Sequence, residues 1–404
     1  MKDNPTATVM VLVEAGSKYE TKEISGLSHF LEHMCFKGTT KRPRGIDIAQ
    51  ELDAIGAEYN AFTGHEYTGY HAKAEAGHVD TLLDVISDIY LNSTFPEMEI
   101  EKEKGVIIEE MNMYEDMPNH DIYDVFLSVF YGDQPVGWKI VGTPETVRNM
   151  KQSDFLKYRK LHYVAGSTTV VIAGGIDARD IFKKVSKRFK EISPALKKNK
   201  KKTHEPKNLP LVHLKQKKTD QAHMMLGFRS FNTYHKDSMI LSVISVLLQG
   251  GMSSRLWQKL REDLGVCYYV NASQDAYTDH GVFSVSAGLD INRVPEVITA
   301  ILEEFRRLKT EPVSSYELDR VKQYMIGRMK LGYESSDTIA YFWGMQEILR
   351  KELLGIEERA DMISEVTSED ILRVSKRIFT EESLALAIIG PFKNEEKFKK
   401  LLKV

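Results

Sequence analysis

The sequence predicts an α+β fold made of two homologous domains, each a largely antiparallel sheet packed with helices. Two observations lead to this prediction. The chain resembles itself at a nearly constant offset, and each copy mixes strand patterns with amphipathic helices. A length of 404 residues also favours two or more domains over a single core.

The internal repeat is clearest near the end of each copy, where SDFLKYRKLHYVAGSTTVVIAGG matches SEDILRVSKRIFTEESLALAIIGP. Asp154 then pairs with Asp370. Further upstream, Gly56 pairs with Gly265 at a slightly shorter offset. An offset that changes so little over most of the chain indicates the duplication of one domain.

Between the two copies, residues 194–210 read PALKKNKKKTHEPKNLP. This stretch is basic, contains prolines near both ends and has almost no apolar side chains, which is typical of a solvated linker. The sequence therefore predicts a first domain over residues 1–193, a linker over 194–210 and a second domain over 211–404.

Strand and helix patterns follow in a similar order within each copy. Strands are indicated by β-branched or alternating apolar residues, and helices by apolar residues at helical spacing. The expected strands are 6–16, 60–74 and 167–175 in the first copy and 222–230, 281–289 and 384–390 in the second; the clearest expected helices are 45–56 and 78–92.

The composition is that of an ordinary globular protein, with 42% hydrophobic and 28% charged residues. A net charge of -3 gives no indication of nucleic-acid binding or of an acidic membrane surface. No apolar run approaches the length of a membrane span, and the first residues lack the form of a secretory signal. Cys35 and Cys267 are the only cysteines, so we expect no disulfide framework and a cytoplasmic protein.

The segment Ser28–Gly38, SHFLEHMCFKG, contains two histidines one helical turn apart. On a helix, His29 and His33 project from one face with about 5–6 Å between their Cβ atoms, which suits two imidazoles on one Zn²⁺. Glu32 shares the face of His29 and can reach a water on the metal without being a ligand. The alternative is a chance His/Glu stripe on a solvent-exposed helix.

A third ligand is expected from EIEKEKGVIIEEMNMYED, because catalytic zinc sites commonly have three protein ligands. Glu103 and Glu110 are two helical turns apart and share one helical face, whereas Glu109 points about 100° away from Glu110. The apolar residues Val106–Ile108 indicate a half-buried helix. The alternative is the usual meaning of a Glu/Lys run, a solvated helix.

As a set, HFLEH, the distant glutamate at position 110, AGSKYE before the motif and FKGT after it resemble the inverzincin signature of the pitrilysin and mitochondrial processing peptidase family. The resemblance covers essentially the whole chain, including the duplication. It implies that His29, His33 and Glu110 bind Zn²⁺. It also implies that Glu32 activates the water and that Glu103 supports the site.

The segment NAFTGHEYTGY resembles the family's substrate-pairing edge strand. This implies that Asn60 and Ala61 bind an extended peptide by adding it to the sheet edge. For Thr63, Thr68 and Tyr70 we expect only the alternation of an ordinary strand.

In the second copy, GGMSSRLWQKLREDLGVCYYV contains Arg261 and Tyr268. These two residues resemble the family's Arg/Tyr pair, which contacts the substrate carbonyl near the metal. From the residues alone they are a helix-surface arginine and a strand tyrosine.

The chain also departs from the family pattern. The family usually has one more strand before residues 6–16, so we expect either an open sheet border or a different natural start. The glycine-rich loop of the non-catalytic processing-peptidase partner is absent, which favours a catalytic subunit.

The resemblance implies a zinc endopeptidase for short or unfolded peptides. In the family, two double-domain halves close around a chamber, so a chain with one half is expected to dimerise, as a homodimer or as a heterodimer. Two alternatives are a non-catalytic scaffold like the core subunits of respiratory complex III, and a peptide-binding module with a structural zinc. Scaffold subunits usually have eroded motifs, whereas this chain retains every part of the motif set. Glu32 distinguishes the peptidase from the module with a structural zinc, because a structural site needs no base.

Overall fold

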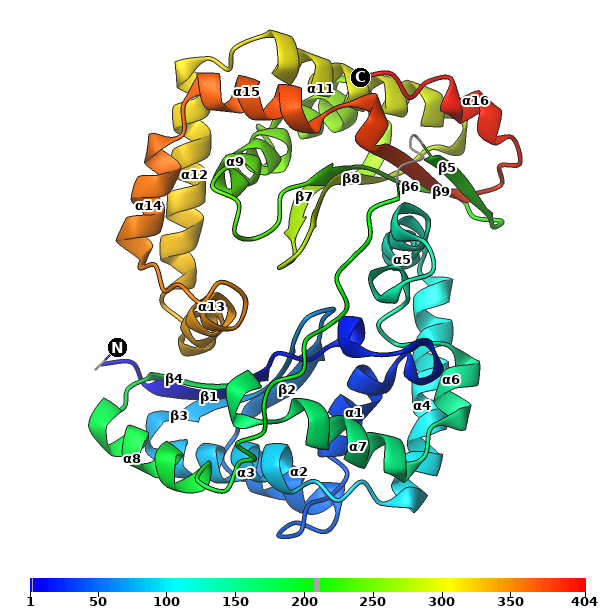
Figure 1. Ribbon diagram of the computed structural model, residues 1–404. Coiled ribbons are helices and arrows are strands. Elements are labelled where there is room, and N and C mark those ends of the chain that lie inside the picture. The colour runs from blue at the N-terminus through cyan, green and yellow to red at the C-terminus, as the bar shows by residue number, and fades with distance from the viewer. Residues whose placement is uncertain (2, 207–210) are drawn as a thin grey trace. The chain divides into compact units, whose positions relative to one another are not determined.

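The computed structural model describes residues 1, 3–206 and 211–404, so residues 207–210 of the predicted linker lie outside the described part. The chain forms two compact units, each with one sheet and its own helices (Figure 1). The first unit comprises Met1–Met113, Gln134–Lys202 and Leu331–Leu353; the second comprises Tyr114–Asp133, Thr203–Lys330 and Leu354–Val404. The predicted α+β class with two sheet-and-helix domains is confirmed.

The sheet of the first unit has four antiparallel strands in the order β2-β3-β1-β4. Strand β2 lies at one edge, with its outer side unpaired among the described residues. The strand bounds are β1 Thr6–Val13, β2 Glu58–Thr63, β3 Thr68–Glu75 and β4 Thr168–Gly174.

The core of the first unit lies between this sheet and the helices on one of its faces. Val9, Val11 and Val13 alternate along β1 and are fully buried against apolar residues of α1 and α3. The helices of this unit are α1 Leu27–Cys35, α2 Gly45–Asp53, α3 Val79–Asn92, α4 Glu97–Asp116, α6 Pro144–Asn149, α7 Gln152–His162, α8 Ala178–Arg188 and α13 Ser336–Leu349.

The second unit has a five-stranded sheet in the order β5-β9-β6-β8-β7, in which only β5 and β9 are parallel among the described pairs. The strands are β5 Leu211–Gln216, β6 Ala222–Ser230, β7 Cys267–Ala276, β8 Gly281–Leu289 and β9 Leu384–Gly390. The helices are α5 Pro118–Tyr131, α9 Ser238–Gln249, α10 Arg255–Trp257, α11 Val294–Thr310, α12 Ser315–Gly332, α14 Ile356–Glu365, α15 Ser368–Ile378 and α16 Glu395–Lys399.

The duplication predicted from the sequence is visible in matching local geometry. Gly56 and Gly265 both have φ +61°, a left-handed conformation that glycine adopts without strain. Asp154 and Asp370 each accept a hydrogen bond from the backbone N–H of the residue that precedes the helix, in the first turn of α7 and of α15. Such shared capping shows that the aligned residues occupy the same structural positions.

Each unit contains one helix from the other half of the sequence (Figure 1). Helix α13 packs on β1 and β4 of the first unit, whereas α5 packs on β6 and β9 of the second. These helices occupy equivalent places in the repeat, since the offset between their first residues, Pro118 and Ser336, is close to that of the sequence repeat. The predicted bounds of the sequence domains, 1–193 and 211–404, stay a prediction, because the compact units exchange these segments.

Residues 194–202 of the linker belong to the first unit and are held to it by lysines. Lys197 pairs with the buried carboxylate of Glu14, and the Lys200 ammonium lies 3.3 Å from a carboxylate oxygen of buried Glu66. Charge patterning alone predicted a solvated stretch, because the acidic partners lie far away in the sequence.

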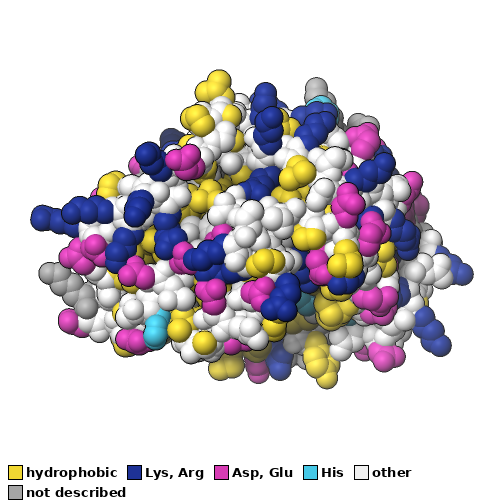
Figure 2. All heavy atoms as spheres, turned by 90° about the horizontal axis from the view of Figure 1, so that it is seen from below, with side chains coloured by type: hydrophobic (Ala, Val, Ile, Leu, Met, Phe, Trp, Pro, Cys, Tyr) yellow, Lys and Arg dark blue, Asp and Glu magenta, His cyan; other side chains and the backbone are white. Residues whose placement is uncertain are grey.

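Charged side chains of both signs are interspersed over the face shown in Figure 2. This mixture agrees with the near-neutral net charge. Within the described residues, no helix is long and apolar enough to cross a membrane. Cys35 is buried, Cys267 is half-buried, and both are free thiols.

Candidate metal centre

Helix α1 carries the two histidines on its less apolar face. Its opposite face is fully buried in the core through Leu27, Phe30, Leu31 and Met34. The helix begins after Gly26, whose φ of +96° turns the chain into the first turn. This anchored helix presents His29 and His33 one turn apart, with ring centroids separated by 4.6 Å.

The first turn of α1 is capped by a buried carboxyl group. The backbone N–H groups of Gly26 and Ser28 donate to Glu20 at 2.8 and 2.6 Å. Burial raises the pKa of Glu20 to about 8, and these donated hydrogen bonds oppose that rise. Glu20, from the AGSKYE segment, therefore fixes where the helix with the two histidines starts.

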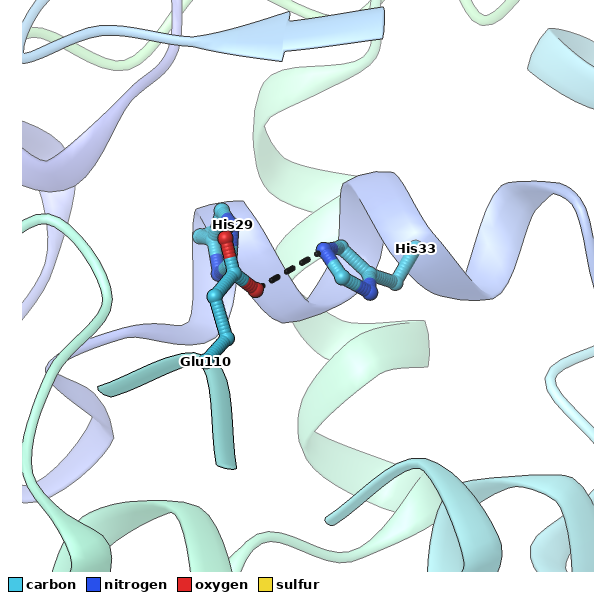
Figure 3. A group of neighbouring side chains, drawn as sticks. All are labelled: His29, His33 and Glu110. Carbon is cyan, nitrogen blue, oxygen red and sulfur yellow. Dashed lines mark ion pairs between the residues drawn. The ribbon is translucent and has the colours of Figure 1, made fainter. Parts of the chain in front are cut away.

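Helix α4 brings Glu110 to the two histidines (Figure 3). A Glu110 carboxylate oxygen lies 3.6 Å from His29 Nε2, and the other lies 3.6 Å from His33 Nε2. Glu109 is exposed, so the two adjacent glutamates have different environments. The donor atoms of the three facing side chains all lie within 4.8 Å of one another.

This donor set fits a zinc ion. Ligands on a tetrahedral Zn²⁺ at about 2.1 Å lie roughly 3.4 Å apart, close to the 3.6 Å between the Glu110 oxygens and the imidazole nitrogens. Two nitrogens and one carboxylate also match the ligand types of catalytic zinc sites, which keep a fourth position open. His29, His33 and Glu110 can therefore hold Zn²⁺.

His33 is held by a second carboxylate, Glu103. The Nδ1–H of His33 donates to Glu103 Oε1 at 3.0 Å, which leaves Nε2 free to bind a metal. Burial lowers the pKa of His33, but the carboxylates of Glu103 and Glu110 outweigh burial and raise it. Burial likewise raises the pKa of Glu103, whereas hydrogen bonds from His33 and Lys37 lower it overall.

Glu32 lies beside the ligands and is held by Thr63. The Thr63 hydroxyl donates to a Glu32 carboxylate oxygen. Burial raises the pKa of Glu32, while the Thr63 hydrogen bond and the neighbouring imidazoles oppose the rise. A divalent cation at the site would oppose this rise in the Glu32 pKa as well. Glu32 is therefore positioned as a proton acceptor next to the metal site.

Sequence reasoning missed the part that Thr63 plays, because it treated this residue as ordinary strand alternation. A usable signal exists. Tyr59, Ala61 and Thr63 alternate along β2, and the first two pack against the core that contains α1. Period-two alternation therefore places the Thr63 side chain on the α1 side as well.

The expectation of one strand over residues 60–74 is wrong, because the stretch forms a hairpin of β2 and β3. Asn60 and Ala61 lie in β2, at the edge of the sheet. Asn60 lies opposite His71 and Ala61 opposite Tyr70 in the register with β3. The backbone N–H of Ala61 donates to the Asn60 side chain at 2.9 Å. A carbonyl group of an added strand can replace the Asn60 side-chain oxygen as the acceptor for this Ala61 N–H.

Arg261 and Tyr268 lie close to each other in the second unit. Arg261 sits in a π-helical turn, Gln258–Asp263, and its guanidinium donates to the backbone carbonyl of Tyr268 at 2.8 Å. It also lies 4.7 Å from the ring centroid of Trp257. Tyr268, on β7, is 75% exposed.

Comparison with known proteins decides the family. Residues 1–144 match the model of the insulinase family, peptidase family M16, and residues 149–325 match the model of the peptidase M16 inactive domain. The chain belongs to peptidase family M16. An uncharacterized zinc protease of Bacillus subtilis, YmxG, is 36% identical over 399 residues, covering 98% of this M16 chain and 96% of the relative. An uncharacterized zinc protease of Rickettsia felis is 32% identical over 397 residues, with coverages of 96% and 92%.

Two solved structures have a fold similar to that of nearly the whole chain. A protease from Helicobacter pylori has a TM-score of 0.90 at 23% identity, covering 96% of this chain and 94% of that one. A chain of complex III from Candida albicans has a TM-score of 0.85 at 15% identity, with coverages of 100% and 96%. At these identities the similarity shows the fold alone.

Proposed function

We propose that this M16 protein is a zinc-dependent endopeptidase that cleaves short or unfolded peptides. The observation that carries the proposal is the convergence of His29, His33 and Glu110, with Glu32 held beside them by Thr63. A purely structural zinc site has no use for that positioned carboxylate. The zinc-protease names of the Bacillus subtilis and Rickettsia felis relatives support the same activity.

The chemistry divides between the ion and the chain. A bound Zn²⁺ supplies a Lewis acid and lowers the pKa of a water toward about 7. Glu32 accepts the proton of the attacking water and returns it to the leaving amine. Thr63 keeps one Glu32 oxygen fixed, which leaves the other free for proton transfer. Glu103 holds the His33 ring in the tautomer that leaves Nε2 free for the metal.

Substrate binding uses the open edge of β2. An extended peptide pairs with the backbone around Asn60 and Ala61, which suits unfolded segments because their backbone N–H and C=O groups are free to pair. Arg261 and Tyr268 stabilise the oxyanion of the attacked carbonyl as preorganised donors. We further propose that two subunits form the closed chamber, with a homodimer as the simplest assembly and a heterodimer as the alternative.

The test uses the variant Glu32→Gln. We expect it to bind one zinc per chain like the wild type and to lose kcat by about a thousandfold or more on an unstructured peptide of a few tens of residues. Zinc is measured by metal analysis, and cleavage by mass spectrometry. Near-wild-type turnover in Glu32→Gln would contradict the mechanism. Wild-type protein that binds zinc but cleaves no peptide would favour the peptide-binding module with a structural zinc.

A further inference from the structure

Lys37 lies two residues after the last residue of α1, Cys35, and is held in a tight turn. Its backbone N–H donates to the Met34 carbonyl at 3.2 Å, which extends the last turn of the helix. Gly38 has φ +138°, and a Cβ there would lie 2.4 Å from the Pro43 carbonyl oxygen. The chain therefore turns sharply after Lys37, and the lysine backbone keeps a fixed position relative to His33.

The Lys37 ammonium reaches the carboxylate that supports the metal site. Lys37 Nζ lies 2.6 Å from Glu103 Oε2, while Glu103 Oε1 accepts from His33 Nδ1 at 3.0 Å. The Glu103 side chain is only 6% exposed. Its carboxylate contacts Lys37 through one oxygen and His33 through the other. One carboxylate thus bridges a fixed ammonium and an imidazole.

Such a bridge constrains the rotation of the Glu103 carboxylate. A carboxylate held at one oxygen only can turn about its last bond, and the hydrogen bond to the imidazole then weakens. With Oε2 tied to Lys37, Oε1 stays aimed at His33. His29 offers a contrast, because its buried Nδ1 has no hydrogen-bond partner among the described residues. Of the two imidazoles, only that of His33 is therefore oriented by a hydrogen bond from its Nδ1 in the described structure.

We propose that Lys37 is a positioning residue for the metal site, which acts through Glu103 to orient His33 and so strengthens zinc binding. The inference rests on the proposed zinc site and adds a residue that the ligand motif does not include. Partners beyond the direct ligands typically change metal affinity by about 10–100-fold, which sets the scale of the effect.

The experiment measures zinc affinity of the full-length chain by competition with a chromogenic chelator. The variants are Lys37→Met, Lys37→Arg, Glu103→Gln and the double variant Lys37→Met/Glu103→Gln. Lys102→Met is the matched control, because Lys102 is on α4 beside Glu103 and pairs with Glu99 instead. The unfolding temperature of each metal-free variant is recorded alongside.

We expect Lys37→Met to weaken zinc binding about tenfold and Lys37→Arg to restore it to within about twofold of wild type. Lys102→Met should leave the affinity unchanged. In the Glu103→Gln background, Lys37→Met should have no further effect, since it acts through that carboxylate. If Lys37→Met does not fold, Lys37→Gln is used and must show the same loss.

Three results would overturn the inference. Zinc affinity of Lys37→Met equal to wild type would exclude a role at the metal, even with a lower unfolding temperature. Full additivity of Lys37→Met and Glu103→Gln would exclude action through Glu103. Wild-type protein without any zinc affinity would reject the proposed site and this inference together, whereas the first two results leave the proposed function intact.

Discussion

The two copies of the repeat place similar elements around two sheets, but within the described residues only the first brings together a candidate metal centre. Helix α1 joins a buried apolar face to His29 and His33, whereas α9, at the same place in the second copy, reads SMILSVISVLLQ and has no metal ligand. Helices α4 and α12 correspond as well, since they begin at Glu97 and Ser315, at the same offset as α5 and α13. Chemistry therefore depends on a few side chains and not on the fold.

Acidic residues on the paired helices have different partners. On α4, Glu110 faces two imidazoles. On α12, Glu317 accepts two hydrogen bonds from the Arg255 guanidinium, at 2.9 and 2.8 Å. The same frame thus gathers candidate metal ligands in one copy and holds a bidentate ion pair in the other. The family description of the second matched region as an inactive domain agrees with this difference.

The largest expected effect comes from exchanging each of these acids for its amide. Glu110→Gln should weaken zinc binding on the order of a thousandfold, because a charged ligand is lost. Glu317→Gln should leave zinc binding unchanged and lower the unfolding temperature instead, because Arg255 loses its charged partner. Calorimetric zinc titration and thermal unfolding measure the two effects.

Glu109→Gln is the control within α4, since Glu109 is exposed one position away. If Glu109→Gln removes zinc and Glu110→Gln does not, the assignment of the third ligand is wrong. If Glu317→Gln alters zinc binding, the second copy is not inert toward the metal.

The second prediction asks whether the inert copy still contributes to catalysis. Glu32→Gln lacks the base in the first copy, and Tyr268→Phe lacks the proposed oxyanion donor in the second. If sites are shared between subunits, a mixed dimer contains one site with both groups intact. Random re-association of equal amounts should then restore about a quarter of wild-type activity.

Activity of the mixture is compared with each variant alone after dissociation and re-association, with mixed dimers verified by mass spectrometry. Recovery to about a quarter supports sites shared between subunits. No recovery in verified mixed dimers would mean that the two residues act within one chain or that Tyr268 is not the donor.

Much of this comparison could be predicted from the sequence. The duplication followed from residue offsets, and the clustering of His29, His33 and Glu110 followed from helical spacing together with a family resemblance. The contributions of Thr63 and Lys37 were missed, because each contacts a glutamate that lies far away in the sequence. The exchange of α5 and α13 between units was also missed, since no local pattern states which sheet a helix covers.

A smaller effect is expected where the copies differ at one buried position. His162 ends α7, and Ile378 ends α15 at the equivalent position of the repeat. Burial, and then the charge of Lys198, lower the pKa of His162 to about 4. The unfolded chain therefore takes up a proton below pH 6.5 that the folded protein resists, so stability is lost as the pH falls from about 6.5 to 4.

The variant His162→Ile copies the second repeat and should remove this loss. The free energy of unfolding of metal-free wild type should fall relative to the variant by up to roughly 3 kcal/mol between pH 7 and pH 4. His78→Ile makes the same change at a half-buried histidine and controls for the introduction of an isoleucine. A constant difference between wild type and His162→Ile over this range would contradict the prediction.

The smallest effect concerns the exchanged helices α5 and α13. Each packs against a strand at a glycine, but the glycine is on the strand in one unit and on the helix in the other. In the second unit the glycine is on the strand. A Cβ at Gly227 of β6 would lie 2.6 Å from the Phe126 ring of α5 and 3.1 Å from the Phe283 carbonyl oxygen. In the first unit the glycine is on the helix, where a Cβ at Gly344 of α13 would lie 2.5 Å from a Leu12 methyl group. A rigid ring and a backbone oxygen can move aside for an added methyl group less easily than the end of a leucine side chain can.

Gly227→Ala should therefore lower the free energy of local opening of α5 by about 2 kcal/mol, a roughly thirtyfold faster amide exchange. Gly344→Ala should change the opening of α13 by less than about 1 kcal/mol, because Leu12 can rotate and alanine favours the helix by about 1 kcal/mol over glycine. Hydrogen exchange followed by mass spectrometry reads both helices in one experiment, and the unaltered helix serves as the control in each variant. Equal loss of protection in α5 and α13 would mean that the chemical nature of the close contact does not set the cost.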